Sequence, residues 1–243
     1  MGLRDYFANR RAARSTRHVE RAAKKLLHKH VQTSERQRAI ELLEDAGSPE
    51  AVKALLMRFT YRTDVQIVDE DEKERAYEAL LRLGERAIEP IREFIHEELA
   101  IYWPLRALTE IAGERAAVDL LLSEIESITD NFDRDLARKN ELVSNLREYQ
   151  DERVLNTLLA LLRDESEDIR IMAIDGLAVF DEVDLAEQLV PILLVDDESV
   201  RIKQMILELL TQRRWNVKRF KRELSDKLPP LYWVDDTGVV QRK

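Results

Sequence analysis

Apolar residues recur along this chain at the spacing of amphipathic helices, and the helices come in pairs. Within residues 72–99, the first helix carries an apolar stripe at positions i, i+3, i+4 and i+7: Ala76, Ala79, Leu80 and Leu83. After Gly84 a second helix carries a similar stripe: Ile88, Ile91, Phe94 and Ile95. Two such helices can bury their stripes against each other, but one pair leaves part of its apolar surface uncovered. The unit therefore needs neighbours of the same kind.

The chain supplies these neighbours. The expected helix pairs are 35–46 with 49–61, 72–83 with 85–98, 101–112 with 114–127, 133–149 with 151–163, 167–180 with 182–195, and 199–213 with 215–227. Residues 62–71 interrupt the helical period and are predicted to be an acidic insertion. Aligned second helices place apolar anchors 30–37 residues apart, at Val52, Ile88, Val118, Leu155 and Leu189. This period, with two helices per unit, predicts an all-α protein, an α-solenoid (superhelix) of about six hairpins.

Short motifs make the pattern more specific. They are Ala-x-x-Ala-Leu-x-x-Leu-Gly at 76–84, Ala-Ile-x-Pro-Ile at 87–91, and the helix openings Ile169-Arg170 and Val200-Arg201 with acidic residues just before them. With these motifs, residues 35–227 resemble HEAT repeats, and more narrowly the short HEAT-like repeats named after phycobilisome lyases. The resemblance implies stacked hairpins whose second helices line a concave face. The family includes scaffolds, lyase subunits, nucleic-acid enzymes and transport factors, so the resemblance indicates a fold and not an activity.

The ends of the chain differ from its middle. Residues 1–38 contain eleven Lys/Arg and three Asp/Glu, whereas the whole protein has a net charge of −9. We therefore expect a basic N-terminal arm with an amphipathic helix at 1–33, the repeat solenoid at 34–228, and a C-terminal tail at 229–243.

Two β-prone runs flank Asp236-Thr237-Gly238 in the tail. The tail is either a flexible motif or a small hairpin that covers the open end of the solenoid. The hairpin is favoured, because Tyr232, Trp233 and Val234 would otherwise be exposed.

Composition excludes several kinds of chemistry. The chain has no Cys and four His, so disulfides, thiolate metal sites and Cys nucleophiles are excluded, and no Ser-His-Asp arrangement is indicated. His96-Glu97 resembles the ligand pairs of deoxyhypusine hydroxylase, a HEAT-like di-iron enzyme, but that enzyme needs several such pairs and this chain has one. We expect no catalytic residue, metal or cofactor. The chain also lacks an apolar run of membrane-spanning length and a signal peptide, which predicts a soluble, cytoplasmic protein.

Three groups of charged residues are candidate binding surfaces. An acidic partner-binding surface is expected on the second helices, at Glu89, Glu93, Glu97, Glu124 and Glu126. The basic arm offers Arg17, Arg21, Lys24, Lys25 and Lys29. A basic C-terminal helix, interleaved with Trp215 and Phe220, offers Arg213, Arg214, Lys218, Arg219 and Arg222.

These features predict a non-enzymatic scaffold or adaptor, monomeric on its own, that binds another protein, with a basic segment of that protein on the acidic surface. One alternative is a nucleic-acid-associated protein that uses the basic arm and helix 212–222. Another is an enzyme similar to bilin lyases or to DNA glycosylases built from HEAT-like repeats.

Overall fold

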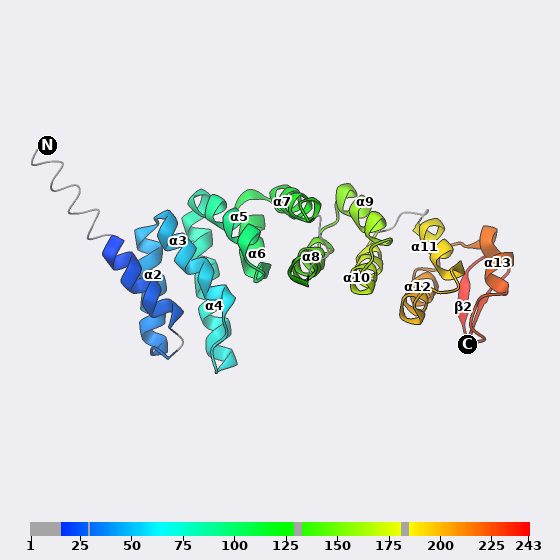
Figure 1. Ribbon diagram of the computed structural model, residues 1–243, viewed down its shortest axis with the longest axis horizontal. Coiled ribbons are helices and arrows are strands. Elements are labelled where there is room, and N and C mark those ends of the chain that lie inside the picture. Colours follow the sequence, from blue (N-terminus) through cyan, green and yellow to red (C-terminus); the bar gives the residue numbers. More distant parts are fainter. Residues whose placement is uncertain (1–15, 29, 129–132, 181–184) are drawn as a thin grey trace, which may run out of the picture. The chain divides into compact units, whose positions relative to one another are not determined.

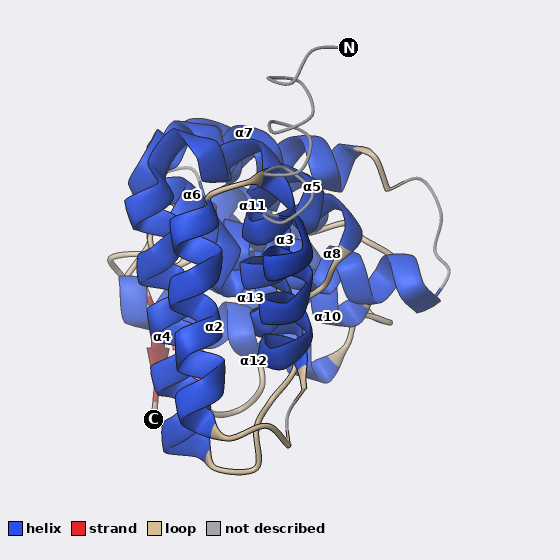
Figure 2. Ribbon diagram, turned by 90° about the vertical axis from the view of Figure 1, so that its left-hand side faces the viewer, coloured by secondary structure: helices blue, strands red, loops and turns tan. Residues whose placement is uncertain are grey.

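The computed structural model describes residues 16–28, 30–128, 133–180 and 185–243, which fall into two compact units, Met1–Glu124 and Ile125–Lys243. Both units are built from helices, and the strands of the described residues belong to one short hairpin near the C-terminus (Figures 1 and 2). The predicted all-α, helical-repeat fold is confirmed.

The first unit contains three pairs of helices preceded by a helix at residues 16–27. Its elements are α2 (Thr33–Ala46), α3 (Pro49–Leu56), η1 (Met57–Thr60), α4 (Gln66–Leu83), η2 (Gly84–Ala87), α5 (Ile88–Glu97), α6 (Tyr102–Ala112) and α7 (Glu114–Glu126). The helix at 16–27 belongs to the core of this unit, because Val19, Ala22 and Leu26 are buried. The hydroxyl of Tyr61 also donates a hydrogen bond to the carbonyl oxygen of Leu26.

The second unit continues the pattern with α8 (Asp133–Leu146), α9 (Glu152–Leu161), α10 (Glu167–Leu177), α11 (Leu185–Leu194) and α12 (Val200–Arg213). It ends with η3 (Lys218–Phe220), α13 (Lys221–Ser225), β1 (Tyr232–Val234) and β2 (Val240–Arg242). On the predicted stripes, Leu80 and Ile91 have no exposed surface, whereas Leu83 and Ile88 are partly exposed. In the second unit, Leu177 on α10 is also completely buried.

Local chemistry explains where the helices begin and end. Gly47, with φ of 54°, takes the left-handed conformation that ends α2, and this conformation is costly for residues with a Cβ. Ser48 then accepts a hydrogen bond from the amide of Ala51, and Pro49 occupies the first position of α3. Gly84, which follows the last residue of α4 and begins η2, also has a positive φ, 57°, but with a ψ of −133° it is outside the left-handed helical conformation of Gly47.

The predicted acidic insertion at 62–71 is wrong in extent, because α4 already begins at Gln66. The apolar period is interrupted there because charged residues take the inward positions of the first turns of α4. Asp69 and Glu72 are buried and bind arginine side chains of the first helix pair. The connection between the two pairs is therefore shorter than the sequence suggests.

The predicted helix at 215–227 is also wrong. Asn216 instead forms a β-bridge with Val239, and the amide of Val217 donates to the carbonyl oxygen of Gly238 at 2.7 Å. Regular α-helix resumes only at Lys221. Backbone groups of this segment therefore form hydrogen bonds with the C-terminal tail in place of helical ones. The helical period of the sequence does not reveal such a long-range pairing.

The tail forms the predicted hairpin, in which β1 and β2 are antiparallel with Trp233 opposite Gln241 and Val234 opposite Val240. Val234 and Val240 are buried, and β2 packs against α12. Because side chains alternate across a strand, Trp233 lies on the opposite face and is 43% exposed.

Candidate interaction surfaces

The exposed face of α5 carries three of the predicted acidic residues, Glu89, Glu93 and Glu97, at four-residue spacing. We call these three residues the acidic ridge. The Nζ of Lys53, on α3, lies 2.6 Å from the Oε2 of Glu93, and this hydrogen bond raises the pKa of Lys53. Among the described residues, neither Glu89 nor Glu97 forms a hydrogen bond or ion pair through its side chain. The ridge therefore has a central carboxylate paired with Lys53, a second at Glu97 that Lys53 attracts without pairing, and a third at Glu89 that has no ion pair among the described residues.

The two predicted acidic residues of α7 lie in different environments. Glu124 is 8% exposed, and both of its carboxylate oxygens lie 3.1 Å from the Nδ1 of His96. Glu126 is exposed, because a residue two positions along a helix points to a nearly opposite side. Glu124 thus holds the exposed ring of His96 on α5, and Glu126 does not share its environment.

Four residues of the predicted basic arm lie on the helix at 16–27 and are exposed: Arg17, Arg21, Lys24 and Lys25. The Nζ of Lys25 lies 3.4 Å from a carboxylate oxygen of Glu35 on α2. Lys29 lies outside the described residues. These cations are therefore on a helix that is packed into the first unit, and not on a separate segment.

The basic C-terminal residues divide into two groups. Arg219 pairs with Glu187 on α11, and Arg213 donates to the carbonyl oxygen of Phe180 at 3.1 Å. Within the described residues, the side chains of Arg214, Lys218 and Arg222 are exposed and have no ion-pair partner. Only this second group is available to a ligand without breaking an existing contact.

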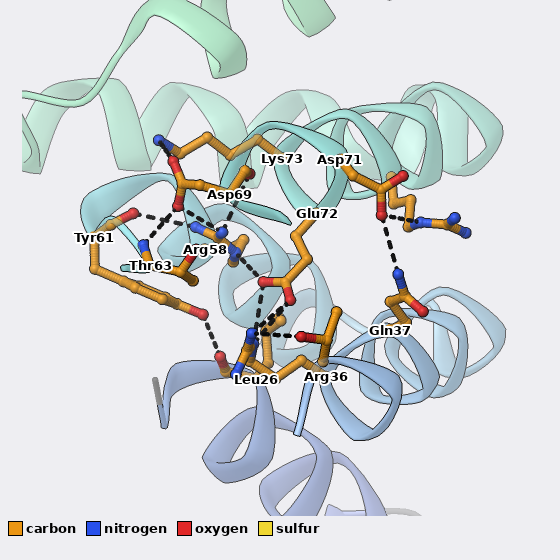
Figure 3. A network of polar contacts seen from close by, with 12 residues as sticks. Leu26, Arg36, Gln37, Arg58, Tyr61, Thr63, Asp69, Asp71, Glu72 and Lys73 are labelled. Carbon is orange, nitrogen blue, oxygen red and sulfur yellow. Dashed lines mark hydrogen bonds and ion pairs between the residues drawn. The ribbon is translucent and has the colours of Figure 1, made fainter. Parts of the chain in front are cut away.

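A network of buried charges joins α2, η1 and α4 in the first unit (Figure 3). The carboxylate of Glu72 accepts hydrogen bonds from Arg36 Nε at 2.9 Å and from Arg58 Nε at 3.0 Å. All three side chains are almost completely buried. The single carboxylate of Glu72 on α4 thus binds two guanidinium groups of the preceding helix pair, that of Arg36 on α2 and that of Arg58 on η1.

The network continues to the loop before α4. Arg58 donates to Asp69 Oδ1 at 2.8 Å and to the carbonyl oxygen of Tyr61 at 3.1 Å. Asp69 also accepts from the amide of Thr63 and pairs with Lys73 at 2.7 Å. Burial raises the pKa of Asp69, but the hydrogen bonds from Lys73 and Arg58 outweigh it, and the pKa lies below its ordinary value. Nearly every donor is satisfied, which favours a structural role for these residues.

Residues 125–210 match the family model of HEAT repeats. The second unit of this chain thus contains HEAT repeats. The matched region covers α8–α11 and most of α12 in the second unit. No curated protein matches the chain. The narrower likeness to phycobilisome-lyase-type repeats stays a prediction.

The sequence contains a signal for the buried charges of the first unit, and the sequence-based prediction missed it. Arg36 lies on the apolar stripe of α2 with Ala39, Ile40 and Leu43, and Glu72 lies on the stripe of α4 with Ala76 and Ala79. A charged residue in a core register must find an opposite charge when it is buried. Two such residues on neighbouring helices therefore indicate a buried pair.

The aromatic residues of the first unit form a cluster. Trp103 stacks on Phe59, with ring centres 6.3 Å apart, and contacts Tyr77 at 5.5 Å. The guanidinium of Arg106 lies 5.3 Å from the Trp103 ring and 5.2 Å from the Tyr77 ring. These contacts give Trp103 a packing role.

Each of the two units also has a surface hollow. The hollow of the first unit has a volume of about 570 Å³ and lies between the loop at Arg62–Asp64, the first turns of α4 and Trp103. The hollow of the second unit, about 760 Å³, lies between the C-terminal end of α9 and α11 and is lined in part by Arg170. Arg170 is engaged with Glu198 at 3.0 Å and with the carbonyl oxygen of Asp164 at 2.8 Å.

Within the described residues, no three His, Asp or Glu side chains converge as metal ligands would. In the same part of the chain, no helix combines the length and the apolar character needed to cross a membrane.

Proposed function

We propose that this protein is a non-enzymatic adaptor that binds another protein, and that the acidic ridge on α5 receives a basic segment of that partner. HEAT repeats commonly serve as scaffolds for protein interactions, which supports the general class. The enzyme alternatives gain no support from a specific contact among the described residues.

The proposal rests on the exposed carboxylates of the acidic ridge. Carboxylates four residues apart on a helix repel one another by a few tenths of a kcal/mol per pair. Lys53 pairs with Glu93 and also attracts Glu97, but among the described residues neither Glu89 nor Glu97 forms an ion pair, and both are exposed. Along α5 they are eight residues apart, which is about 12 Å at 1.5 Å per residue. A partner with two cations at this separation would compensate both.

We also propose that the protein acts as a monomer in the cytoplasm. Its parts are an N-terminal arm at 1–33, a repeat array at 34–228 and a C-terminal tail at 229–243. The arm's helix supplies core contacts to the first unit through Leu26, so it is proposed as a folded part of the array's first end.

The test compares two triple variants of the full-length protein. Glu89→Lys/Glu93→Lys/Glu97→Lys reverses the ridge. The matched control, Glu41→Lys/Asp45→Lys/Glu74→Lys, makes the same charge change at exposed positions of α2 and α4. Immobilised wild type, ridge variant and control are exposed to extract from the native source, and captured proteins are identified by mass spectrometry at 50 and 300 mM salt.

We expect the wild type and the control to capture the same basic proteins at low salt, and the ridge variant to lose them. Charge complementarity mainly raises the association rate, so binding by the wild type should slow as salt is added. If the ridge variant captures the same proteins as the control, the ridge is not the binding surface.

A further inference from the structure

The C-terminal end of the second unit has a charge opposite to that of the rest of the protein. Residues 212–243 contain nine Lys/Arg and four Asp/Glu, a net charge of +5, whereas the whole chain has −9. Residues 1–211 therefore carry −14. At physiological ionic strength, charges farther apart than about 8 Å are largely screened, so this end can attract an anion despite the acidic character of the chain.

The fold gathers these cations around the terminal hairpin. Asn216 and Val217 bond to the turn of the hairpin through Thr237 and Gly238. Lys221 donates to the carbonyl oxygen of Asp235 at 3.0 Å. The helix α13 also packs beside β1, as Figure 1 shows at the red end of the ribbon. Segments that are well separated in the sequence are thus held together at this end of the unit.

The surface has cations that no contact uses. As described above, Arg214, Lys218 and Arg222 are exposed and unpaired within the described residues. They come from three consecutive parts of the fold: the residue after α12, the start of η3 and the interior of α13. Such a series can follow an extended polyanion better than it can hold one small anion.

The same surface presents aromatic rings. Trp233 is exposed on the outer face of the hairpin. The guanidinium of Arg219 lies 4.7 Å from the Phe220 ring. Exposed rings and planar guanidinium groups are the groups on which unpaired bases stack, typically with about 1–3 kcal/mol per base.

We infer that this C-terminal surface, defined by Arg214, Lys218, Arg222 and Trp233, binds single-stranded nucleic acid without sequence preference. The three cations would contact phosphates, and Trp233 would stack on a base. An anionic membrane is less well matched, because an interfacial segment needs a continuous apolar face, and the hairpin exposes only Leu231 and Trp233 as large apolar side chains. This inference is independent of the acidic ridge, which lies in the first unit.

The experiment measures fluorescence anisotropy of 5′-fluorescein-labelled dT20 and U20 with the full-length protein. Three phosphate contacts to a single strand predict a slope of about −2 for log K against log salt concentration, or about 20-fold weaker binding at 200 mM than at 50 mM salt. The variant Arg214→Asn/Lys218→Gln/Arg222→Gln should bind more weakly and lose most of this slope. Asn is used at position 214 because the residue there has φ of 54°, which Asn tolerates.

The stacking contact is tested by Trp233→Ala, which should weaken binding about 5- to 150-fold without changing the salt slope. Trp233→Phe keeps a ring and should bind within a few-fold of the wild type. Far-ultraviolet circular dichroism establishes that each variant is folded.

A matched control removes three exposed cations elsewhere, Arg17→Gln/Arg21→Gln/Lys24→Gln, and should bind both oligonucleotides as the wild type does. The inference is overturned if the wild type binds neither oligonucleotide, or if this control weakens binding as much as the C-terminal variant. It is also overturned if the protein binds no oligonucleotide but cosediments with vesicles of phosphatidylcholine that contain phosphatidylserine as the minor, anionic lipid.

Discussion

The Nε of Arg58 lies 3.0 Å from the Oε2 of Glu72, and neither side chain has any exposed surface. Burying two charges costs several kcal/mol each, and their attraction returns about the same amount only when the geometry is good and the other donors are satisfied. The pair is therefore a weak source of stability while it is intact. Removing one partner is costly, because the other charge stays buried without compensation.

Glu72→Gln should therefore lower the free energy of unfolding by about 3–5 kcal/mol, since it leaves Arg36 and Arg58 without their shared carboxylate. Urea unfolding monitored by circular dichroism measures this change. Glu78→Gln on the same helix removes an exposed ion pair with Arg82 and should change stability by less than about 1 kcal/mol. Equal effects of the two substitutions would contradict the structural role of the network.

Truncation of one core leucine in each unit should cost about 2–5 kcal/mol through lost burial and a residual cavity. Leu80→Ala tests α4 and Leu177→Ala tests α10, both of which are completely buried positions. In a repeat array the loss should appear first in the affected unit, so hydrogen exchange should increase in α4 or in α10 respectively. Leu42→Ala, at a position 48% exposed, is the control and should have little effect.

Gly176→Ala should destabilise the protein even though alanine is the better helix former by about 1 kcal/mol. A Cβ at position 176 would lie 2.8 Å from the Cβ of Arg147 and 2.9 Å from a methyl carbon of Leu158. Relief of such contacts typically costs about 1–3 kcal/mol. Asn156→Ala on the exposed side of α9 should be neutral or slightly stabilising in the same thermal unfolding assay. Stabilisation by both substitutions would show that α10 is not packed as closely as described.

The C-terminal hairpin should weaken at acid pH. The carboxylate of Asp235 accepts hydrogen bonds from Thr237, Val239 and Gln241, and the bond from Thr237 is foremost in holding its pKa well below the ordinary value. A depressed pKa means that the contribution to stability is complete above the unfolded value, about 3.9, and is lost as pH falls below it.

Amide exchange of Val239 and Val240 should thus be constant between pH 7 and 5, after correction for intrinsic rates, and should increase relative to the rest of the chain below about pH 4. Asp235→Asn removes the titrating charge and should abolish this selective increase. If the hairpin of Asp235→Asn shows the same pH dependence as the wild type, another group is responsible.

The helix pairs could be predicted from sequence because a stripe of apolar residues lowers its free energy by burial against the stripe of the neighbouring helix. Gly47, Ser48 and Pro49 fixed one boundary to within a residue, since each of them has a distinct backbone role. The errors arose where side-chain charge or long-range strand pairing decided the structure. Asp69 extends α4 through contacts with Arg58, and Val217 is held in a β-bridged segment by Gly238, which belongs to the distant C-terminal tail.

The candidate surfaces were only partly visible in the sequence. The spacing of Glu89, Glu93 and Glu97 indicated a common face, and all three are exposed. It did not indicate that Lys53 neutralises Glu93 or that Glu124 is buried beneath His96, because both contacts join different helices. Likewise, the sequence of the basic run at 213–222 did not indicate which of its cations bind another residue, as Arg213 and Arg219 do, and which have no ion pair among the described residues.

The position of the hairpin on α12 has a consequence for self-association. In a helical array, the last apolar face is the place where an identical chain could be added, and repeated addition would produce filaments. Val234 and Val240 occupy that face, and Arg242 at the rim lies 3.9 Å from Glu208 on α12. A chain shortened before residue 231 would leave this face uncovered, and its molecules would be expected to polymerise end to end in a concentration-dependent way.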